Sequence, residues 1–359
     1  MKVLFICELI KNKSGGLSSS LRNERMLQSF YGSESVVTFK ISRNNSNKFL
    51  SLLNDLRHKS FYGLSEIHKR HIKQMIYRNE IQLCFLDSSC LGQLAETIKK
   101  EFPHVKVVTF FQNIEYLFQK DVIRLSRRFY FSYRLYNAYY NEKKACKYSD
   151  EVIVLNNRDS KELFRIYKRK ASIVIPISLK DVYIPQTVRS AIQSYCLFVG
   201  SNFPPNMEGI THFIKKILPC MNTKLVVIGS GMDILKKTFP NTEHLDVKGF
   251  VKDVSTYYYN ALFVIMPIYS GSGMKVKTAE ALMYGKYILA TKEALEGYEI
   301  NQNIGMQCNT DAEFIDAVKK LERTPPNRFN EESREIYLNM YSDIVAQKNY
   351  NVLFKSLNV

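Results

Sequence analysis

The stretch LFVIMPIYSGSGMKVKTAEAL, residues 262–282, contains the pattern on which the fold prediction rests. A run of apolar residues ends at Pro267, a Gly-Ser-Gly loop follows, and a helical pattern begins near Met274. Short apolar runs bounded by turn residues are typical of buried strands, and the residues after Met274 have the spacing of an amphipathic helix. The stretch therefore predicts one strand–loop–helix unit of an α/β protein.

The same alternation of apolar strands and helical stretches runs through the rest of the chain. Continuous apolar strands that alternate with helices predict a parallel sheet covered on both faces. The expected strands are 2–7, 36–41, 81–87, 105–111, 151–155 and 172–175, and then 195–200, 224–229, 245–250, 262–267 and 287–291. The expected helices are 17–30, 65–78, 91–100 and 158–167, and four that begin near Asn206, Gly231, Asp253 and Met274.

Two series of strands predict two doubly wound, Rossmann-like domains that face each other across a cleft. We expect the first domain at residues 1–180 and the second at 181–330, joined within the polar stretch 179–194 that contains Pro185. The last segment, 331–359, is helical and has no strand after it. It either caps the second domain or crosses back to the first.

Composition excludes several classes of protein. The 359 residues include 51 Lys and Arg against 34 Asp and Glu, a net charge of +17, and 45% are hydrophobic, which excludes a disordered chain. No window has 18 consecutive apolar residues, and MKVLFICELI at the start reads as a strand rather than a signal peptide. The seven cysteines form no CxxC pair, which indicates reduced thiols in a cytoplasmic protein and no zinc site.

The loop of the quoted stretch is a candidate anion site. Its backbone amides and the N-terminus of the following helix favour negative charge, whereas lysines in the first helical turn are each unfavourable by about 0.3–1 kcal/mol. A bound polyanion such as a nucleotide diphosphate would explain the lysines; the alternative is a pair of solvated lysines on an exposed helix. The residues concerned are Gly271, Ser272, Gly273, Met274, Lys275 and Lys277.

Glu280 lies beside the apolar stripe of the same predicted helix. Its carboxylate can accept hydrogen bonds from vicinal hydroxyls such as those of a ribose. It can equally pair with Lys277 at the i,i+3 spacing, which contributes only a few tenths of a kcal/mol.

Other strand ends of the second series would line the same crevice, because ligands of open parallel sheets bind beyond the carboxyl ends of the strands. Each of these turns is common by itself, and the backbone after the third strand could read a nucleobase edge. The residues predicted to bind the donor here are Gly200, Ser201, Asn206, Gly229, Phe250 and Val251.

In the first domain, two strand ends carry candidate residues for the cleft. Gly15 and Gly16 follow the first strand and can bring backbone close to a ligand, although an ordinary strand-to-helix turn explains them equally well. Gln112, Asn113 and Glu115 follow the strand 105–111. For Asn113 the alternative is an N-cap of the next helix.

These motifs together resemble the retaining GT-B glycosyltransferases of the GT4 type, also described as glycosyl transferases group 1. The resemblance covers nearly the full length, and its most specific parts are LFVGS at 197–201 with Pro205 and Asn206, and the stretch 270–282 with Gly285 and Lys286. It also includes the two adjacent glycines at 15 and 16, QNIEY at 112–116 and DEVIVLN at 150–156.

The resemblance implies a nucleotide-diphosphate-sugar donor bound mainly by the second domain, an acceptor bound mainly by the first, and neither metal nor cofactor. Lys275, Lys277 and Glu280 would be the catalytic residues, with Glu280 as the second glutamate of the family's E-x7-E motif, which binds the ribose. The acceptor would be a glycan or a polyprenyl-diphosphate-linked glycan of cell-surface polysaccharide synthesis, such as capsule, O-antigen or exopolysaccharide.

The sequence departs from the family pattern at three places. Ser272 stands at the first glutamate of E-x7-E, Ser201 and Asn206 lie where an Arg and a Lys usually follow the Val-Gly strand, and Gln112 replaces a cleft histidine. Lys275 and Lys277 would supply the missing positive charge. The alternatives are a non-catalytic glycan- or nucleotide-binding partner of another transferase, and a nucleotide-sugar epimerase of the same fold.

Positive charge is concentrated in two aromatic-rich segments. Residues 120–170 contain fourteen Lys and Arg against six Asp and Glu, and residues 57–78 add three histidines, His58, His68 and His71. Basic segments with aromatics suit an anionic membrane surface, so we expect a cytoplasmic protein that is peripheral on the inner face of the plasma membrane. A solvated face is the alternative; nucleic acid, although such patches also bind it, is not the expected partner.

Overall fold

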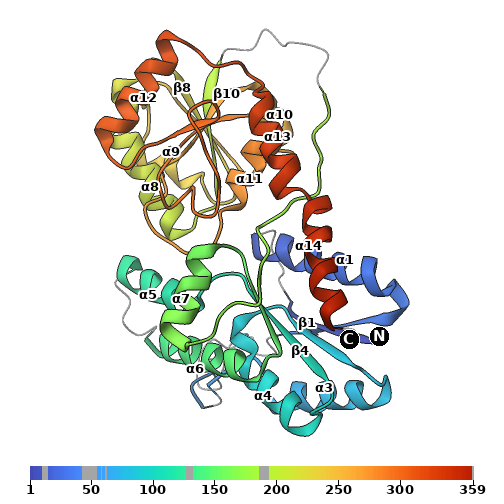
Figure 1. Cartoon of the computed structure of the whole chain (residues 1–359). Coiled ribbons are helices and arrows are strands. Elements are labelled where there is room, and N and C mark those ends of the chain that lie inside the picture. Colours follow the sequence, from blue (N-terminus) through green and yellow to red (C-terminus); the bar gives the residue numbers. More distant parts are fainter. Residues whose placement is uncertain are drawn as a thin grey trace. The chain divides into compact units, whose positions relative to one another are not determined.

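The computed structural model forms two compact units (Figure 1). Unit 1 contains Met1–Ile177 and Ala346–Val359, and unit 2 contains Ser178–Val345. The division after Ile177 lies three residues before the boundary expected from the sequence. The residues that the structure describes are 1–9, 15–42, 55–57, 59–60, 63–126, 132–185 and 194–357.

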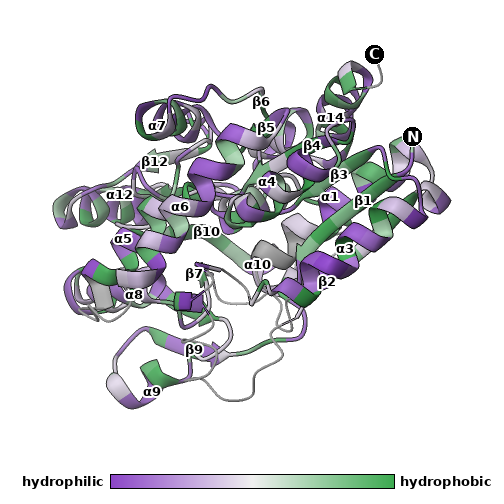
Figure 2. Ribbon diagram, turned by 90° about the horizontal axis from the view of Figure 1, so that it is seen from below, coloured by the Kyte–Doolittle hydropathy of each residue, from purple (hydrophilic) through white to green (hydrophobic). Residues whose placement is uncertain are grey.

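Unit 1 is built on a parallel sheet with the strand order β2-β1-β3-β4-β5-β6. Its strands are apolar and mostly fully buried, as the sequence predicted for a sheet covered on both faces, and Figure 2 shows β1 in the green of hydrophobic residues. The strands are β1 Val3–Glu8, β2 Val36–Ile41, β3 Leu83–Leu86, β4 Lys106–Phe111, β5 Glu151–Val154 and β6 Ile173–Val174. The helices are α1 Gly15–Tyr31, α3 Glu66–Arg78, α4 Gly92–Glu101, α5 Glu115–Ser126, α6 Ser132–Tyr148 and α7 Asn157–Tyr167.

Unit 2 repeats the architecture with the order β12-β11-β10-β7-β8-β9, again parallel. The expected strands are all present, and the short edge strand β12 was not expected. The strands are β7 Tyr195–Val199, β8 Lys224–Ile228, β9 Leu245–Gly249, β10 Ala261–Met266, β11 Tyr287–Ala290 and β12 Gly305–Gln307. The helices are α8 Pro204–Lys216, α9 Ile234–Thr238, α10 Ser255–Asn260, α11 Val276–Met283 and α12 Asp311–Arg323.

The chain direction across each sheet reverses at one point. In unit 2 the chain moves from β7 through β8 to β9 and then returns to β10 on the other side of β7. In unit 1 the reversal lies between β1 and β3. The loops after two neighbouring strands diverge at such a point, which leaves room for a ligand at the carboxyl edge of the sheet.

A glycine lets α8 touch the end of β10 at this point in unit 2. A Cβ placed on Gly209 would lie 1.6 Å from the carbonyl oxygen of Pro267, so the helix backbone packs directly on the backbone that leaves the strand. No side chain fits between them. This contact fixes the start of α8 relative to the loop that follows β10.

The C-terminal segment is two helices with an interruption, rather than the one helical stretch that the sequence suggested. α13 covers Glu331–Ile336, a π-helical turn covers Tyr337–Tyr341, and α14 covers Asp343–Leu357. Backbone bonds between Leu179 and both Tyr341 and Asp343 tie the first half of this segment to the start of unit 2. The residues from Ala346 onward belong to unit 1.

In unit 1, α14 lies beside α1 (Figure 1), where it covers the fully buried Arg22. The guanidinium donates to Asn23 Oδ1, to the carbonyl of Pro176 at 3.3 Å and to Tyr350 Oη at 3.4 Å. It also lies over the rings of Phe110 and Tyr350, at 5.3 and 5.8 Å from their centroids. Neutral acceptors and aromatic faces therefore solvate this buried cation.

All seven cysteines are free thiols, and all but Cys220 are buried. Within the described ranges, no helix has both the length and the apolar character needed to cross a membrane.

The Gly209 contact predicts the effect of a single methyl group. Gly209→Ala places Cβ inside the Pro267 carbonyl, so α8 and β10 must separate, and we expect the free energy of unfolding to fall by about 1–3 kcal/mol. Urea unfolding measures it, with Lys215→Ala on the exposed face of the same helix as control. Equal stabilities of Gly209→Ala and the parent protein would contradict the packing described.

Candidate functional site

The loop between β10 and α11 depends on two glycines with left-handed backbone. Gly271 has φ 126° and Gly273 has φ 66°, a region that other residues rarely adopt. α11 begins at Val276, and the side chain of its N-cap residue, Lys275, makes no capping hydrogen bond. The loop thus brings backbone amides and a helix N-terminus to the carboxyl edge of the sheet, as the sequence predicted.

Lys275 faces the protein rather than the solvent. Its ammonium donates to the carbonyl of Gly273 at 2.8 Å and forms an ion pair with Glu293 at 2.7 Å, and both side chains are less than one-fifth exposed. The interpretation of a solvated lysine pair is therefore wrong for this residue. Glu293 had no sequence signal, because it lies 18 positions away in a different loop.

Lys277 connects α11 to the elements around β7. Its ammonium donates to Asn206 Oδ1 at 2.6 Å and lies 4.9 Å from the centroid of the Phe198 ring. The side chain is half-buried and has no ion-pair partner among the described residues. Burial, with repulsion from Lys275, lowers the pKa of Lys277 to about 7. An added anion would relieve this desolvated cation.

Asn206, like Ser201, lies where the family pattern has a basic residue. The structure brings the ammonium of Lys277 to the Asn206 amide, so positive charge reaches the start of α8 from the neighbouring helix. The predicted compensation for the missing basic residue is therefore geometrically possible for Lys277, whereas the charge of Lys275 is paired with Glu293.

Glu280 does not pair with Lys277, although the two are one helical turn apart. Its carboxylate accepts a hydrogen bond from Tyr258 Oη at 3.1 Å, and burial raises its pKa. Tyr258 is fully buried and stacks on Tyr284, with ring centroids 4.8 Å apart. Sequence reasoning missed Tyr258, since nothing in its local pattern distinguishes it from a core aromatic residue.

The turns after β7 and β8 are close together, and the amide of Gly229 donates to the carbonyl of Gly249 at the end of β9, at 2.7 Å. A Cβ on Gly229 would lie 1.7 Å from the carbonyl oxygen of Gly200, and Gly229 itself has φ 141°, so only glycine fits there. The carbonyl of Ser201 accepts from the Asn206 amide at 2.9 Å. Beyond β9, Phe250 is 68% exposed and Val251 is half-buried.

Ser272 occupies the position at which the E-x7-E motif has its first glutamate. Its Oγ is shielded from solvent and has no hydrogen-bond partner among the described residues. A buried hydroxyl without a partner is costly, typically about 1–3 kcal/mol. The position therefore suits a ligand group that can donate or accept a hydrogen bond.

The predicted residues of unit 1 lie at the carboxyl edge of its sheet. Gly15 and Gly16 begin α1, and Gln112 and Asn113 follow β4 as half-buried residues. Asn113 is not the N-cap of α5, because Ile114 precedes the helix. The first two amides of α5 instead donate to the buried carboxylate of Glu142, at 2.7 and 3.1 Å.

Glu115 and Glu142 are both buried, and burial is the main cause of their raised pKa values, to about 7 for Glu142. Glu115 accepts from the Gln119 amide at 2.6 Å. Glu142 also accepts from Tyr167 Oη at 2.7 Å. Glu142 thus holds the start of α5 in place, a role that sequence reasoning did not assign.

Asp87 was also missed. It follows β3, beside the reversal point of the first sheet, where it accepts from Ser20 and, at 2.6 Å, from Asn23, both on α1. Burial raises the pKa of Asp87 to about 6. The sequence placed Asp87 at the end of a strand but gave no sign of its partners on α1.

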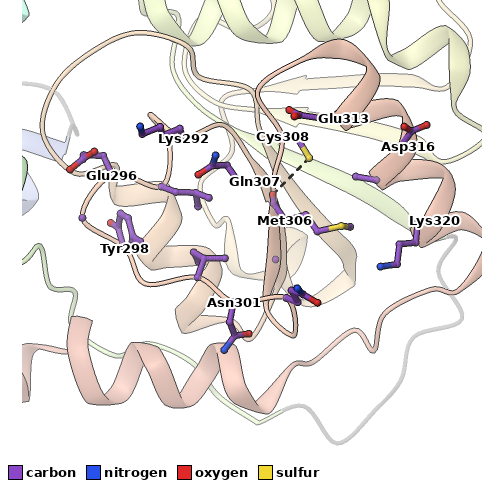
Figure 3. Close-up of a pocket in the computed structure, with 16 residues that line it drawn as sticks. Lys292, Glu296, Tyr298, Asn301, Met306, Gln307, Cys308, Glu313, Asp316 and Lys320 are labelled. Carbon is purple, nitrogen blue, oxygen red and sulfur yellow. Dashed lines mark hydrogen bonds between the residues drawn. The ribbon is translucent and has the colours of Figure 1, made fainter.

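A cavity of about 750 Å³ lies elsewhere in unit 2, beside the edge strand β12 (Figure 3). It is lined by the loop after β11, including Leu295 and Tyr298, by Met306 of β12 and by Lys320 of α12. The predicted donor-binding residues are not among its lining residues.

A known protein family matches unit 2 of the chain. Residues 193–323, which cover the strands of unit 2, match the family model of glycosyl transferases group 1. Among curated proteins none matches this sequence.

Solved structures match both units. Sucrose-phosphate synthase from Thermosynechococcus elongatus has a TM-score of 0.73 at 12% identity, with 99% of each chain covered. HepE from Anabaena in complex with UDP has a TM-score of 0.71 at 14% identity, with 99% of this chain and 100% of that chain covered. A glycosyltransferase from Rickettsia africae has a TM-score of 0.67 at 14% identity, with 99% of this chain and 98% of that chain covered. The chain has the GT-B fold. The predicted fold class is confirmed, and the family match supports a glycosyltransferase.

The lowered pKa of Lys277 predicts a pH-dependent stability. An unfolded lysine has a pKa near 10.4, so between about pH 7 and pH 10 the unfolded chain holds a proton that folded Lys277 has released. This group's contribution to the free energy of unfolding therefore rises with pH, by at most about 1.4 kcal/mol per unit.

The test compares the parent protein with the variant Lys277→Met. The substitution removes the titrating ammonium of residue 277, and the other buried lysine, Lys286, is present in both proteins. We expect the parent protein to gain stability relative to Lys277→Met between pH 7 and pH 9 in urea unfolding. Parallel stability curves would show that Lys277 is not desolvated.

Proposed function

We propose that the protein is a retaining glycosyltransferase that moves a sugar from a nucleotide-diphosphate-sugar donor to a glycan or polyprenyl-diphosphate-linked acceptor, without a metal. The observation that carries the proposal is Lys277, a half-buried cation with no ion-pair partner among the described residues, at the reversal point of the second sheet. A diphosphate satisfies such a cation beside backbone amides, because its oxygens accept hydrogen bonds from both and carry the opposite charge.

The donor assignment has support from the comparisons. HepE has been solved with UDP and with UDP-glucose, and it shares the fold of this chain along its full length. By this proposal the loop 271–274 and Lys277 bind the diphosphate, and the carboxylate of Glu280 binds the ribose hydroxyls. Phe250 and Val251 would lie near the base.

The difficult step of such a transfer is departure of the diphosphate from the anomeric carbon, because negative charge develops on the leaving oxygen. Preorganised amides and an ammonium stabilise that charge where it develops. The acceptor hydroxyl would attack from the face that the leaving group vacates, and its proton would pass to the departing phosphate. This route retains the anomeric configuration and requires no nucleophile from the protein.

For the acceptor and its location, we propose a cytoplasmic protein peripheral on the inner membrane face, acting in cell-surface polysaccharide synthesis. The exposed stripe of α3 supports this. It carries Ile67 and Tyr77, 58% and 80% exposed, among exposed Arg70, His71 and Arg78. A basic helix with apolar anchors is typical of binding to anionic lipid. Residues 127–131, which include Arg127 and Arg128, and His58 lie outside the described residues.

The donor site predicts the outcome of two substitutions. Lys277→Ala and Glu280→Ala should each reduce sugar transfer by about 100-fold or more, because each removes a group that contacts the donor. The assay measures release of nucleoside diphosphate and transfer to acceptor, after a thermal-shift panel has identified the nucleotide sugar. A ligand at 100 times its Kd should stabilise the parent protein by about 2.7 kcal/mol.

Lys319→Ala, on the exposed face of α12, is the matched control and should transfer at the parent rate. Full activity of both site variants would refute the residue assignments. Nucleotide binding without any release of diphosphate would instead favour a non-catalytic partner of another transferase.

The stripe on α3 predicts membrane binding that depends on lipid charge. The double variant Ile67→Ser, Tyr77→Ser should weaken binding to vesicles that contain anionic lipid by about a hundredfold in co-sedimentation, since each of the two apolar side chains contributes about 1.5 kcal/mol when it is buried. Ile234→Ser, an exposed apolar residue of α9, is the control. Equal binding to neutral and anionic vesicles, or none to either, would refute this part of the proposal.

A further inference from the structure

The two lysines of α11's N-terminal region have different surroundings. Lys277 has no ion-pair partner among the described residues, whereas Lys275 is held by protein groups on several sides. Its ammonium donates to the carbonyl of Gly273 at 2.8 Å and to that of Ser272 at 3.4 Å, and it pairs with Glu293.

The positions of these carbonyls determine where the amides of the loop point. In a trans peptide the C=O and the N–H lie on opposite sides of the same plane, and the described chain has no cis peptide bond. Because the Ser272 and Gly273 carbonyls turn toward the Lys275 ammonium, the N–H groups of Gly273 and Met274 turn the other way. Lys275 thus orients the two peptide groups that were predicted to bind a diphosphate.

The loop after β11, residues 291–298, contacts both the ammonium and the carbonyl of Lys275. We call this segment the strap. Glu293 pairs with the Lys275 ammonium at 2.7 Å, and Tyr298 Oη donates to the Lys275 carbonyl at 2.6 Å. The carbonyl of Ala294 accepts from Thr278 Oγ1 at 2.9 Å, inside the first turn of α11. Three contacts therefore fasten the strap to the start of the helix.

The strap is itself supported on its far side. The Tyr298 ring packs on Tyr341 with centroids 4.8 Å apart, and Tyr341 Oη donates to the carbonyl of Gly297. Figure 3 shows Lys292, Glu296 and Tyr298 of the strap along one wall of the cavity beside β12. Lys292 is exposed there and is a natural control position.

We propose that Glu293 and Tyr298 are positioning residues: they hold Lys275 so that the loop 272–274 presents its N–H groups to the donor's diphosphate. The inference rests on the proposed function, since it assigns these residues to the same donor site. It also changes the role expected for Lys275 from the sequence: the ammonium would act by binding the loop carbonyls and would not contact the phosphates. Lys277 would then be the cation that contacts the ligand.

A double-mutant cycle separates positioning from direct contact. If Lys275 works only while Glu293 holds it, Lys275→Gln and Glu293→Gln should each raise the Kd for the nucleoside diphosphate about tenfold. The double variant should then be no weaker than the weaker single variant, because both changes remove the same loop orientation. Tyr298→Phe should raise the Kd in the same direction, and Lys292→Gln should leave it within twofold.

The opposite result is equally definite. If Lys275 contacts the phosphates directly, Glu293→Gln releases it toward the ligand, and binding is unchanged or tighter. Additive losses in the double variant, about a hundredfold in all, would also overturn the inference.

Amide hydrogen exchange of the loop tests the positioning without any donor. Exchange over residues 271–276 should accelerate in Glu293→Gln and Lys275→Gln, but not in Lys292→Gln. Unchanged exchange in the first two variants would overturn the inference. A parent protein that binds no nucleoside diphosphate, yet shows these exchange differences, would instead refute the proposed function and retain the positioning role.

Discussion

The direct contact between α8 and the end of β10 is the constraint on which the candidate site depends. Gly209 lets the helix backbone touch the Pro267 carbonyl, at the point where the chain direction across the second sheet reverses. This approach places Asn206, in the first turn of α8, within hydrogen-bond distance of Lys277 in the first turn of α11. Two helix N-termini whose contacting residues are 71 positions apart in the sequence thus lie at one edge of the sheet.

The charges at this edge are not equivalent, and their burial explains the difference. Lys275 is paired with Glu293, so its ammonium is not left as an uncompensated charge, and it donates to the carbonyl of Gly273 in the loop. Lys277 has an amide oxygen and an aromatic face instead of a carboxylate, and its pKa falls accordingly. The Ser272 Oγ beside them has no hydrogen-bond partner in the part of the chain that the structure describes, so the site has polar groups that a ligand could satisfy.

Much of the fold could be predicted from the sequence, because long apolar strands and amphipathic helices have periods that a single chain displays. β12 escaped prediction since its three residues include only one large apolar side chain. Asn113 was given an alternative role as a helix cap, but that function belongs to Glu142, which reaches the helix from another element. Local patterns carry no information about such distant partners.

The candidate site shows the same limit at the level of single side chains. The loop glycines and Lys277 were identified because their functions depend on local backbone and on position in a helix. Glu293, Tyr258 and Asp87 were not, because each acts through a partner on a separate element. What the sequence could not provide was the three-dimensional arrangement that pairs Lys275 with Glu293 and places Lys277 beside an amide oxygen and an aromatic ring.

Unit 1 is built from two separate segments of the chain, and this has a consequence for synthesis on the ribosome. Unit 2 is one continuous segment, whereas unit 1 needs both Met1–Ile177 and Ala346–Val359. The buried guanidinium of Arg22 donates a hydrogen bond to the hydroxyl of Tyr350, which lies 328 residues later in the sequence. The unit that is translated first is therefore completed last, after the whole of the other unit has left the exit tunnel.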